Sequence, residues 1–311
     1  SFTGDDNLYV RLKTAGPGAG FKTNFGDKPT TYHNETTSTT DNTVKVDKIW
    51  YTFPVGDKVT ATIGPLIENY YMLAATPSVY KPKVLKAFRF GGHGVAFGAS
   101  SSVGAGLKYE GDNGFASSIT LNSKQGSTTT GLLTSADDTK LNVMGAFTKD
   151  NYHVSATYTT QQDGWTHGYP YFAILPGGTG LDTTGFALRG WWRPDETGTA
   201  VPSVSVGYDT MSIEGVTSGF KEGEGFTVGL NWSDMFQADD TIGLAFGQPI
   251  KGTNHTDSST TDVDPFIWEA YYSFKPNDSI EITPGIFGGS DVFSDTNDDI
   301  VGAVIATTFR F

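Results

Sequence analysis

The last twelve residues of this chain alternate between two kinds of side chain, and this alternation limits the folds open to the chain. Because successive side chains of a β-strand point to opposite faces, a period of two places the two kinds on opposite faces. We therefore expect a strand over 300–311 that carries Arg310 on its inner face. Its outer face is predicted to carry a mainly apolar set (Val301, Ala303, Ile305, Thr307, Phe309 and Phe311).

Similar alternating segments recur along the chain, and the connections between them alternate between short and long. The short ones are 54–58, 110–114, 148–151, 194–202, 233–239 and 275–279, and the long ones are 15–44, 67–102, 123–139, 161–183, 211–223, 249–264 and 288–298. About 14 strands result, or about 16 if 82–102 holds another pair. An even strand number with this asymmetry is typical of an outer-membrane barrel with both chain ends in the periplasm. A soluble sandwich or propeller does not require it.

Composition agrees with a barrel that spans a membrane by strands. The 311 residues include 39 glycines and 13% aromatic residues, and the mean hydropathy is −0.27. Lipid-facing and interior residues alternate in such barrels, so mean hydropathy stays low. We predict an all-β fold: one transmembrane, up-and-down antiparallel β-barrel domain over 1–311. Aromatic residues near strand ends predict two interfacial girdles (Trp50, Phe53, Trp191, Trp192, Trp232, Phe236, Phe266, Trp268, Phe309 and Phe311).

Several classes of chemistry find no support in the sequence. The net charge of −13 argues against a nucleic-acid partner. The chain has no cysteine, which excludes thiol catalysis and thiolate metal sites, and its five histidines lack metal-ligand spacing. We therefore expect a non-enzymatic protein without catalytic residues, metal or cofactor.

Charges sort by strand face. The predicted inner positions are mainly basic and include Arg11, Lys13, Lys108 and Arg189, against acidic residues such as Glu269 and Glu281, whereas acids gather in the long loops 257–264 and 291–299. One interpretation is an internal positive field that favours anions. The other is that rim residues such as Lys58 merely pair with acids in the turns.

The connection 67–102 is too apolar for a free external loop, so we expect residues 67–90 to fold into the barrel and narrow it. Its cations would then face Glu269 or Glu281 (Lys81, Lys83, Lys86 and Arg89). The alternative is a loop packed on the barrel mouth or at a subunit contact. The connection 161–183 is a second candidate. Small residues at inner positions, such as Gly106, Gly229 and Gly285, predict open space, which favours a channel over a plugged barrel.

Segments at both ends resemble the cyanobacterial OprB-like porins, often labelled iron-uptake porins, whereas 115–260 matches only in pattern. They are the start Ser-Phe-Thr-Gly-Asp-Asp-Asn-Leu (1–8), the hairpin 50–59, and the strands 279–286 and 297–311. The resemblance implies an outer-membrane channel for passive diffusion of inorganic ions and small hydrophilic solutes, surrounded by lipid. It also implies a homotrimer and an upstream domain, outside this chain, that binds peptidoglycan. A strip on the outer face could form the trimer contact (Ala61, Ile63, Ala105 and Ser117). The alternative is a plugged or structural barrel that serves as a wall anchor or receptor.

Overall fold

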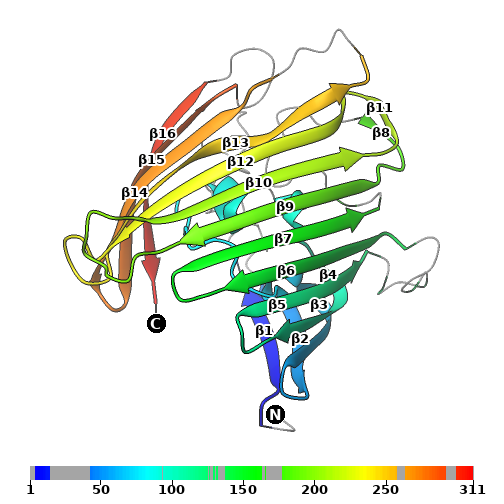
Figure 1. The fold of residues 1–311 in the computed structure, drawn as a ribbon, viewed down its shortest axis with the longest axis horizontal. Coiled ribbons are helices and arrows are strands. Elements are labelled where there is room, and N and C mark those ends of the chain that lie inside the picture. Colours follow the sequence, from blue (N-terminus) through cyan, green and yellow to red (C-terminus); the bar gives the residue numbers. More distant parts are fainter. Residues whose placement is uncertain are drawn as a thin grey trace.

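A single antiparallel sheet of fourteen strands in chain order dominates the computed structural model (Figure 1). The structure describes residues 4–14, 43–92, 94–124, 126, 129, 131, 137–162, 165, 177–257, 263–291 and 299–310. The strands are β1 (Asn7–Lys13), β2 (Lys45–Val55), β3 (Val59–Glu68), β4 (Ser101–Glu110), β5 (Phe115–Ser123), β6 (Thr139–Thr148), β7 (Tyr152–Gln161), β9 (Thr183–Trp192), β10 (Ser203–Ile213), β12 (Phe220–Ser233), β13 (Thr241–His255), β14 (Phe266–Asn277), β15 (Ile280–Ser290) and β16 (Ile300–Phe309).

The predicted number of 14 strands is confirmed, and the alternative of 16 is wrong. The segment 82–102 holds no strand pair but a 3₁₀ helix, η4 (Lys86–Gly91), and one turn of α-helix, α1 (Gly94–Phe97). Two further short strands, β8 (Gly177–Gly178) and β11 (Val216–Ser218), pair with each other outside the main sheet. Within the described ranges, no helix has the length and apolar character needed to cross a membrane.

Three strands are longer than the sequence pattern predicts. β10 and β12 continue into the predicted loop 211–223, and β13 continues through Pro249 to His255. Between the pairs Glu224–Lys251 and Phe226–Gln248, two residues of β13 lie opposite one residue of β12. Such a bulge accommodates a proline, which cannot donate to a regular ladder. The proline therefore interrupts the pairing without ending the strand.

The two faces of the sheet differ as the alternation predicts. Apolar side chains at the outward positions are exposed along the sheet (Leu8, Val10, Ile63, Leu107, Ile119, Val143, Val154, Leu188, Val206, Phe226, Ile286, Val301 and Ile305). In particular, Ile305 is 74% exposed, which confirms the predicted register of β16. The opposite face, called the inner face below, carries buried polar residues such as Thr120 and Asn142. Phe311 lies outside the described residues.

Both terminal strands have their chain ends at the edge of the sheet formed by the short turns. Asn7 at the start of β1 lies opposite Thr52, near the turn after β2, and Phe309 at the end of β16 lies opposite Ile280. β1 and β16 therefore run in opposite directions. The described residues show no pairing between these two strands, which are the edges of a strongly bent sheet (Figure 1). Their antiparallel directions are those that closure of an even-stranded barrel requires.

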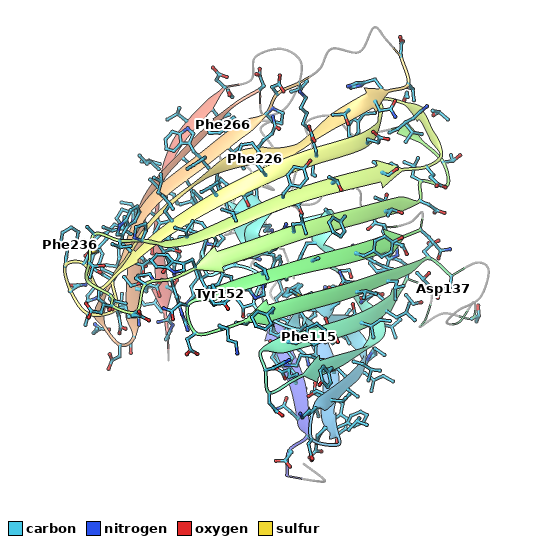
Figure 2. All side chains as sticks on the ribbon, in the orientation of Figure 1. Phe115, Asp137, Tyr152, Phe226, Phe236 and Phe266 are labelled. Atoms are coloured by element: carbon cyan, nitrogen blue, oxygen red, sulfur yellow. The ribbon has the colours of Figure 1, made fainter. Side chains whose placement is uncertain are left out.

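The predicted aromatic girdles are correct only in part. Phe236 is 75% exposed at a turn, and Figure 2 shows it at the margin of the sheet, with Phe115 and Tyr152 on the outer face. Trp50 and Trp191, in contrast, are buried on the inner face. Successive side chains of a strand point to opposite faces. Because the neighbours of each of these tryptophans point outward, the tryptophan itself points inward and cannot belong to a girdle.

The turn that presents Phe236 is held by one carboxylate. Asp240 accepts hydrogen bonds from the backbone amides of Met235, Phe236 and Gln237 at 2.7, 2.9 and 3.1 Å. Burial of this carboxylate favours its neutral form, but the three amides outweigh burial and hold the pKa of Asp240 below its usual value. The turn is thereby fixed with an aromatic side chain at its tip.

If the exposed apolar face meets lipid, the cost of a charge there depends on depth. We expect Val143→Arg, in the middle of β6, to lower the free energy of unfolding by about 2–4 kcal/mol in vesicles. The matched variant Phe115→Arg, at the short-turn edge, should cost only about 0–1 kcal/mol. Equilibrium unfolding in urea measures both, and equal losses would contradict a lipid-facing surface.

Candidate functional site

The inner face of the sheet is covered by the connection between β3 and β4. This stretch, residues 69–92 and 94–99, is called the β3–β4 segment below. It contains η3 (Asn69–Met72), η4 and α1, and appears in cyan behind the front strands in Figure 1. η3 contacts β4 and β5, whereas η4 and α1 contact strands from β7 to β12. The segment thus reaches across most of the sheet.

Apolar packing accounts for its position. Tyr80, Val84, Leu85 and Phe88 form one buried cluster with residues of the later strands (Ala245, Ile267, Tyr271 and Phe287). Leu73 and Phe97 form a second with residues of the earlier strands (Ala116, Met144, Ala146 and Ala187). Burial of an aliphatic or aromatic side chain stabilises a fold by roughly 1.5–3 kcal/mol. The first cluster holds the middle of the segment against the later strands, and the second holds both of its ends against the earlier strands.

The peptide groups of the segment bind polar side chains of the strands. Ser118, Ser205 and Asn231 accept hydrogen bonds from the amides of Ala74, Val79 and Lys81, at 3.0, 3.0 and 3.3 Å. Other inner-face groups donate to its carbonyls, at 2.5–2.9 Å (Trp191 to Thr76, Tyr271 to Lys81, Thr227 to Gly91 and Asn142 to Phe97). An irregular buried chain needs such partners, because an unpaired backbone group is costly.

Glu269 of β14 binds the middle of the segment. Its carboxylate accepts hydrogen bonds from the Tyr80 hydroxyl at 2.6 Å, the Val84 amide at 3.1 Å and the Leu85 amide. The Glu269 side chain is fully buried. The residue was predicted to face the cations of the segment, and its contacts are instead with a hydroxyl and backbone amides.

Glu281 of β15 joins the segment to the last strand. Its carboxylate forms an ion pair with Lys83 of the segment, as the sequence predicts, and a second with Arg310 at 2.7 Å. Ser273 donates a hydrogen bond to it at 3.0 Å. The contact also places the Arg310 guanidinium on the inner side, in agreement with the prediction.

A buried ion pair supports η4. The Arg189 guanidinium donates to Asp209 Oδ1 at 2.7 Å and to the Phe90 carbonyl at 2.6 Å. The side chains of Arg189 and Asp209 are 0% and 2% exposed. Arg189 therefore contacts the segment rather than solvent, although its position in the sequence alternation predicts only that it faces inward.

The other predicted cations occupy diverse surroundings. Arg11 binds Asp47 and Glu68 at 2.6 and 2.7 Å, and Lys108 binds Glu110 at 2.8 Å. Lys13 and Lys86 are half-buried, whereas Lys81 and Arg89 are exposed. Lys58 pairs with Asp112 in the next short turn. Since so many wall cations have acidic partners, the inner wall is closer to neutral than the count of basic positions predicts.

Small inner-face residues make room for the segment, which corrects their interpretation as open space. An added Cβ at Gly229 would lie 2.4 Å from the Tyr80 ring, and one at Gly285 would lie 2.7 Å from Val84. At Gly207 it would lie 1.7 Å from the carbonyl oxygen of Gly91. Each of these strand glycines therefore leaves the space that one particular residue of the segment occupies. Such a glycine is called a seat below.

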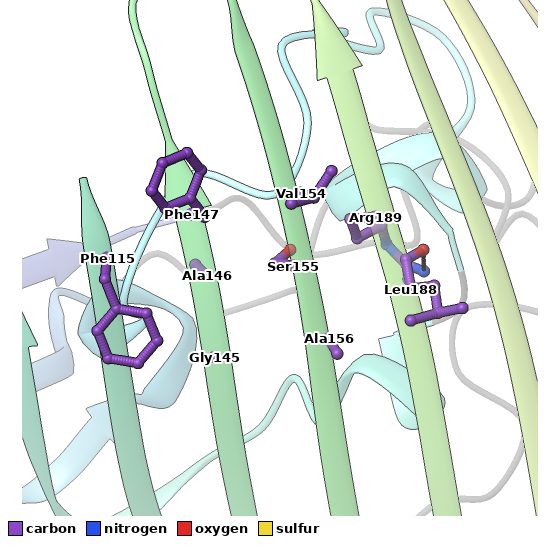
Figure 3. Close-up of a pocket in the computed structure, with 9 residues that line it drawn as sticks. All are labelled: Phe115, Gly145, Ala146, Phe147, Val154, Ser155, Ala156, Leu188 and Arg189. Carbon is purple, nitrogen blue, oxygen red and sulfur yellow. Dashed lines mark hydrogen bonds between the residues drawn. The ribbon is translucent and has the colours of Figure 1, made fainter. Parts of the chain in front are cut away.

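The outer face offers a contrast. Figure 3 shows a shallow apolar depression where Phe115, Phe147, Val154 and Leu188 surround Gly145 and Ala156. A Cβ added at Gly145 would meet no atom within 4 Å. Glycines on the two faces of the same sheet therefore have opposite tolerance for a side chain.

This contrast gives a direct test of the seats. We expect Gly207→Val to displace the segment and to cost about 1–3 kcal/mol by overpacking, whereas Gly145→Val should be close to neutral. Thermal unfolding measures stability, and limited proteolysis between residues 69 and 99 reports displacement. Equal behaviour of the two variants would show that the segment does not rest on β10.

A second pair of variants tests the buried ion pair. Asp209→Asn leaves the Arg189 guanidinium buried without its counter-charge, which typically costs about 3–5 kcal/mol. The control Asp239→Asn removes an exposed partner of Lys275 and should cost at most about 1 kcal/mol. Urea unfolding compares them. A small loss for Asp209→Asn would mean that Arg189 finds solvent or another acid.

Sequence reasoning missed the serines, asparagines and threonine that bind the backbone of the segment. The alternation places them on the inner face, but nothing in the sequence pairs them with an irregular chain more than a hundred residues away, such as Ser205 with Val79. The second inward candidate, 161–183, lies mostly outside the described residues, as do the acidic loops.

The comparisons with known proteins agree with this geometry. Residues 1–311 match the model of the OprB family of carbohydrate-selective porins. No curated protein matches the sequence. Pseudomonas putida OprB, in a high-pH structure, is similar in fold, with a TM-score of 0.55 at 10% identity over 87% of this chain and 74% of that one.

Two further solved structures share the fold. A loop L8 deletion mutant of Vibrio cholerae OmpT has a TM-score of 0.59 at 11% identity over 88% of this chain and 82% of its own. The trimer form of OmpT has a TM-score of 0.56 at 11% identity, over 86% and 82%. With the whole chain matched by the family model, this protein belongs to the OprB family of carbohydrate-selective porins, β-barrel channels of the outer membrane.

Proposed function

We propose that the protein forms a water-filled channel for the passive diffusion of carbohydrates, other small hydrophilic solutes and inorganic ions, narrowed by the β3–β4 segment. The observation that carries the proposal is the set of contacts from this segment to strands across most of the sheet, from Ser118 in β5 to Glu281 in β15. A chain that rests on the inner face of a barrel wall takes up part of its cross-section.

Charges near the narrow part would then act on permeating solutes. Lys81 and Arg89 are the exposed cations of the segment, and Lys83 is held by Glu281. Fixed charges of this kind steer small ions and impede larger solutes. Arg11, Lys13 and Lys108 lie on the wall of the first strands, and Arg189 and Glu269 would serve by positioning the segment.

The protein's setting is proposed on the same basis. Both chain ends would face the periplasm, because they lie at the short-turn edge. An upstream wall-binding region would connect the barrel to peptidoglycan. A homotrimer is favoured by an apolar hollow of about 440 Å³ on the outer face of β3 to β5, which includes Ile63 and Ala105 of the expected contact strip. A monomer by native mass spectrometry in mild detergent would overturn the trimer.

Deletion of residues 72–88 tests the channel and the role of the segment together. We expect single-channel conductance in planar bilayers to rise and larger sugars to enter in liposome swelling, because the lumen loses the side chains that fill it. Glu281→Gln, which weakens the Lys83 contact while keeping the segment, should give a smaller rise in conductance.

Two other results would contradict the proposal. An unchanged conductance in a folded deletion variant, verified by heat-dependent mobility in gels, would place the narrow point elsewhere. A wild-type barrel that does not conduct, beside a deletion variant that does, would favour the alternative of a plugged barrel serving as a wall anchor or receptor.

A further inference from the structure

A cavity of about 260 Å³ lies at the long-loop edge of the sheet, beside the β3–β4 segment. The end of β3, the segment and the adjacent ends of β4, β5 and β6 line it, together with Trp165. Its charged lining residues are Glu68, Arg89, Lys124 and Lys140. The volume is just below the roughly 300–1,000 Å³ of sites for drug-sized ligands, so it suits a solute the size of a monosaccharide.

Two lysines of this cavity lie against one aromatic ring. Lys124 and Lys140 place their ammonium groups 4.8 and 5.6 Å from the centre of the Trp165 ring. Among the described residues, neither has a carboxylate within ion-pair distance, and Lys140 donates only to the Ala99 carbonyl at 3.3 Å. Arg11, Lys83 and Arg189 each have such a partner.

This arrangement is costly unless an anion is present. Lys140 is 2% exposed, and burial removes hydration from an ammonium group that has no carboxylate partner among the described residues. Two like charges on one ring also repel each other. The cation–π contacts with Trp165 offset part of this cost. A carboxylate or phosphate between the lysines would offset much more.

The remaining lining suits a hydroxylated ring. Ser100 and Ser101 supply hydroxyl groups, and Tyr70 and Trp165 supply aromatic rings beside the polar groups. The Glu68 carboxylate can accept hydrogen bonds, and its charge is already matched by Arg11 at 2.7 Å and Lys48 at 3.7 Å. An anion between the lysines therefore does not meet an uncompensated carboxylate.

We propose that this cavity is a binding subsite for anionic monosaccharides, with Lys124 and Lys140 holding the acidic group and Trp165 fixing the lysines. The proposal rests on the proposed channel function, for which it names a substrate class at one end of the passage. The shared chemistry is a sugar ring with one anionic group, either the carboxylate of a sugar acid or the phosphate of a sugar phosphate.

Equilibrium binding to the folded barrel in detergent tests the subsite without relying on conduction. Calorimetric titrations would use glucuronate, glucose 6-phosphate and uncharged glucose. We expect at least one of the two anions to bind, and to bind about tenfold or more tightly than glucose, because its charge strengthens the hydrogen bonds that the lysines donate. The tighter of the two identifies the acidic group. Failure of both anions to bind the wild type more tightly than glucose would overturn the subsite.

Variants assign the binding to these lysines. Lys124→Gln, an exposed position, should weaken anion binding about tenfold without loss of the fold, and Lys140→Gln should do the same. The control Lys275→Gln removes one positive charge at the opposite edge and should leave binding unchanged. Equal binding by the Lys124→Gln and control variants would overturn the proposal.

Bilayer conductance with the same sugars separates the two proposals. Partial block of a conducting wild-type channel by the bound anion, relieved in Lys124→Gln, supports both. Anion binding to a barrel that does not conduct would overturn the channel while the subsite stands. A conducting channel whose wild type binds none of the anions would overturn the subsite alone.

Discussion

The structure depends on satisfying the peptide groups of an irregular chain placed against a sheet. The β3–β4 segment has little regular secondary structure, so its amides and carbonyls cannot pair with one another as those of a helix do. Strand side chains from Ser118 to Glu269 take their place. Non-helical backbone at membrane depth is tolerated only where it is enclosed by protein or lines a water-filled cavity. The inner face of the sheet supplies protein contacts of this kind to the segment.

The same requirement explains why the two faces read so differently in the sequence. The outer face contacts lipid, which requires only that its side chains be apolar. Residues such as Val143 and Ile305 fulfil this requirement equally well. The inner face has to match one particular chain. Gly207 has no side chain because the Gly91 carbonyl occupies that space, and Asn231 is polar because the Lys81 amide faces it.

This difference sets what could be predicted from the sequence. Every strand must place apolar side chains on the outer face, and this shared requirement produces a period of two in the sequence. The fourteen strands, their faces and the short turns could therefore be predicted from the alternation. The apolar content of the segment predicted that it would be covered rather than free, and it packs on the inner face of the sheet. Of the four cations predicted to face Glu269 or Glu281, Lys83 pairs with Glu281. The seats at Gly207 and Gly229 could not be predicted, because a glycine that receives a chain and a glycine that borders water look identical in sequence. The continuation of β13 through Pro249 was missed because a bulge depends on the partner strand.

The charge pairs could likewise be predicted only in part. The strand faces identified the basic positions, but the partners of Arg11 and Arg189 lie on neighbouring strands whose exact register the pattern does not give. The two lysines on Trp165 are notable because that compensation is absent from the described residues around them.

The contact of Glu281 with both Lys83 and Arg310 has a consequence for how the barrel assembles. Lys83 and Glu281 are 198 positions apart, so almost the whole chain must be present before this contact can form. Contacts of such large sequence separation slow folding, because the intervening chain is ordered before they are made. A barrel whose wall and internal segment meet through such distant contacts is therefore expected to fold more slowly than a chain of the same length with local contacts.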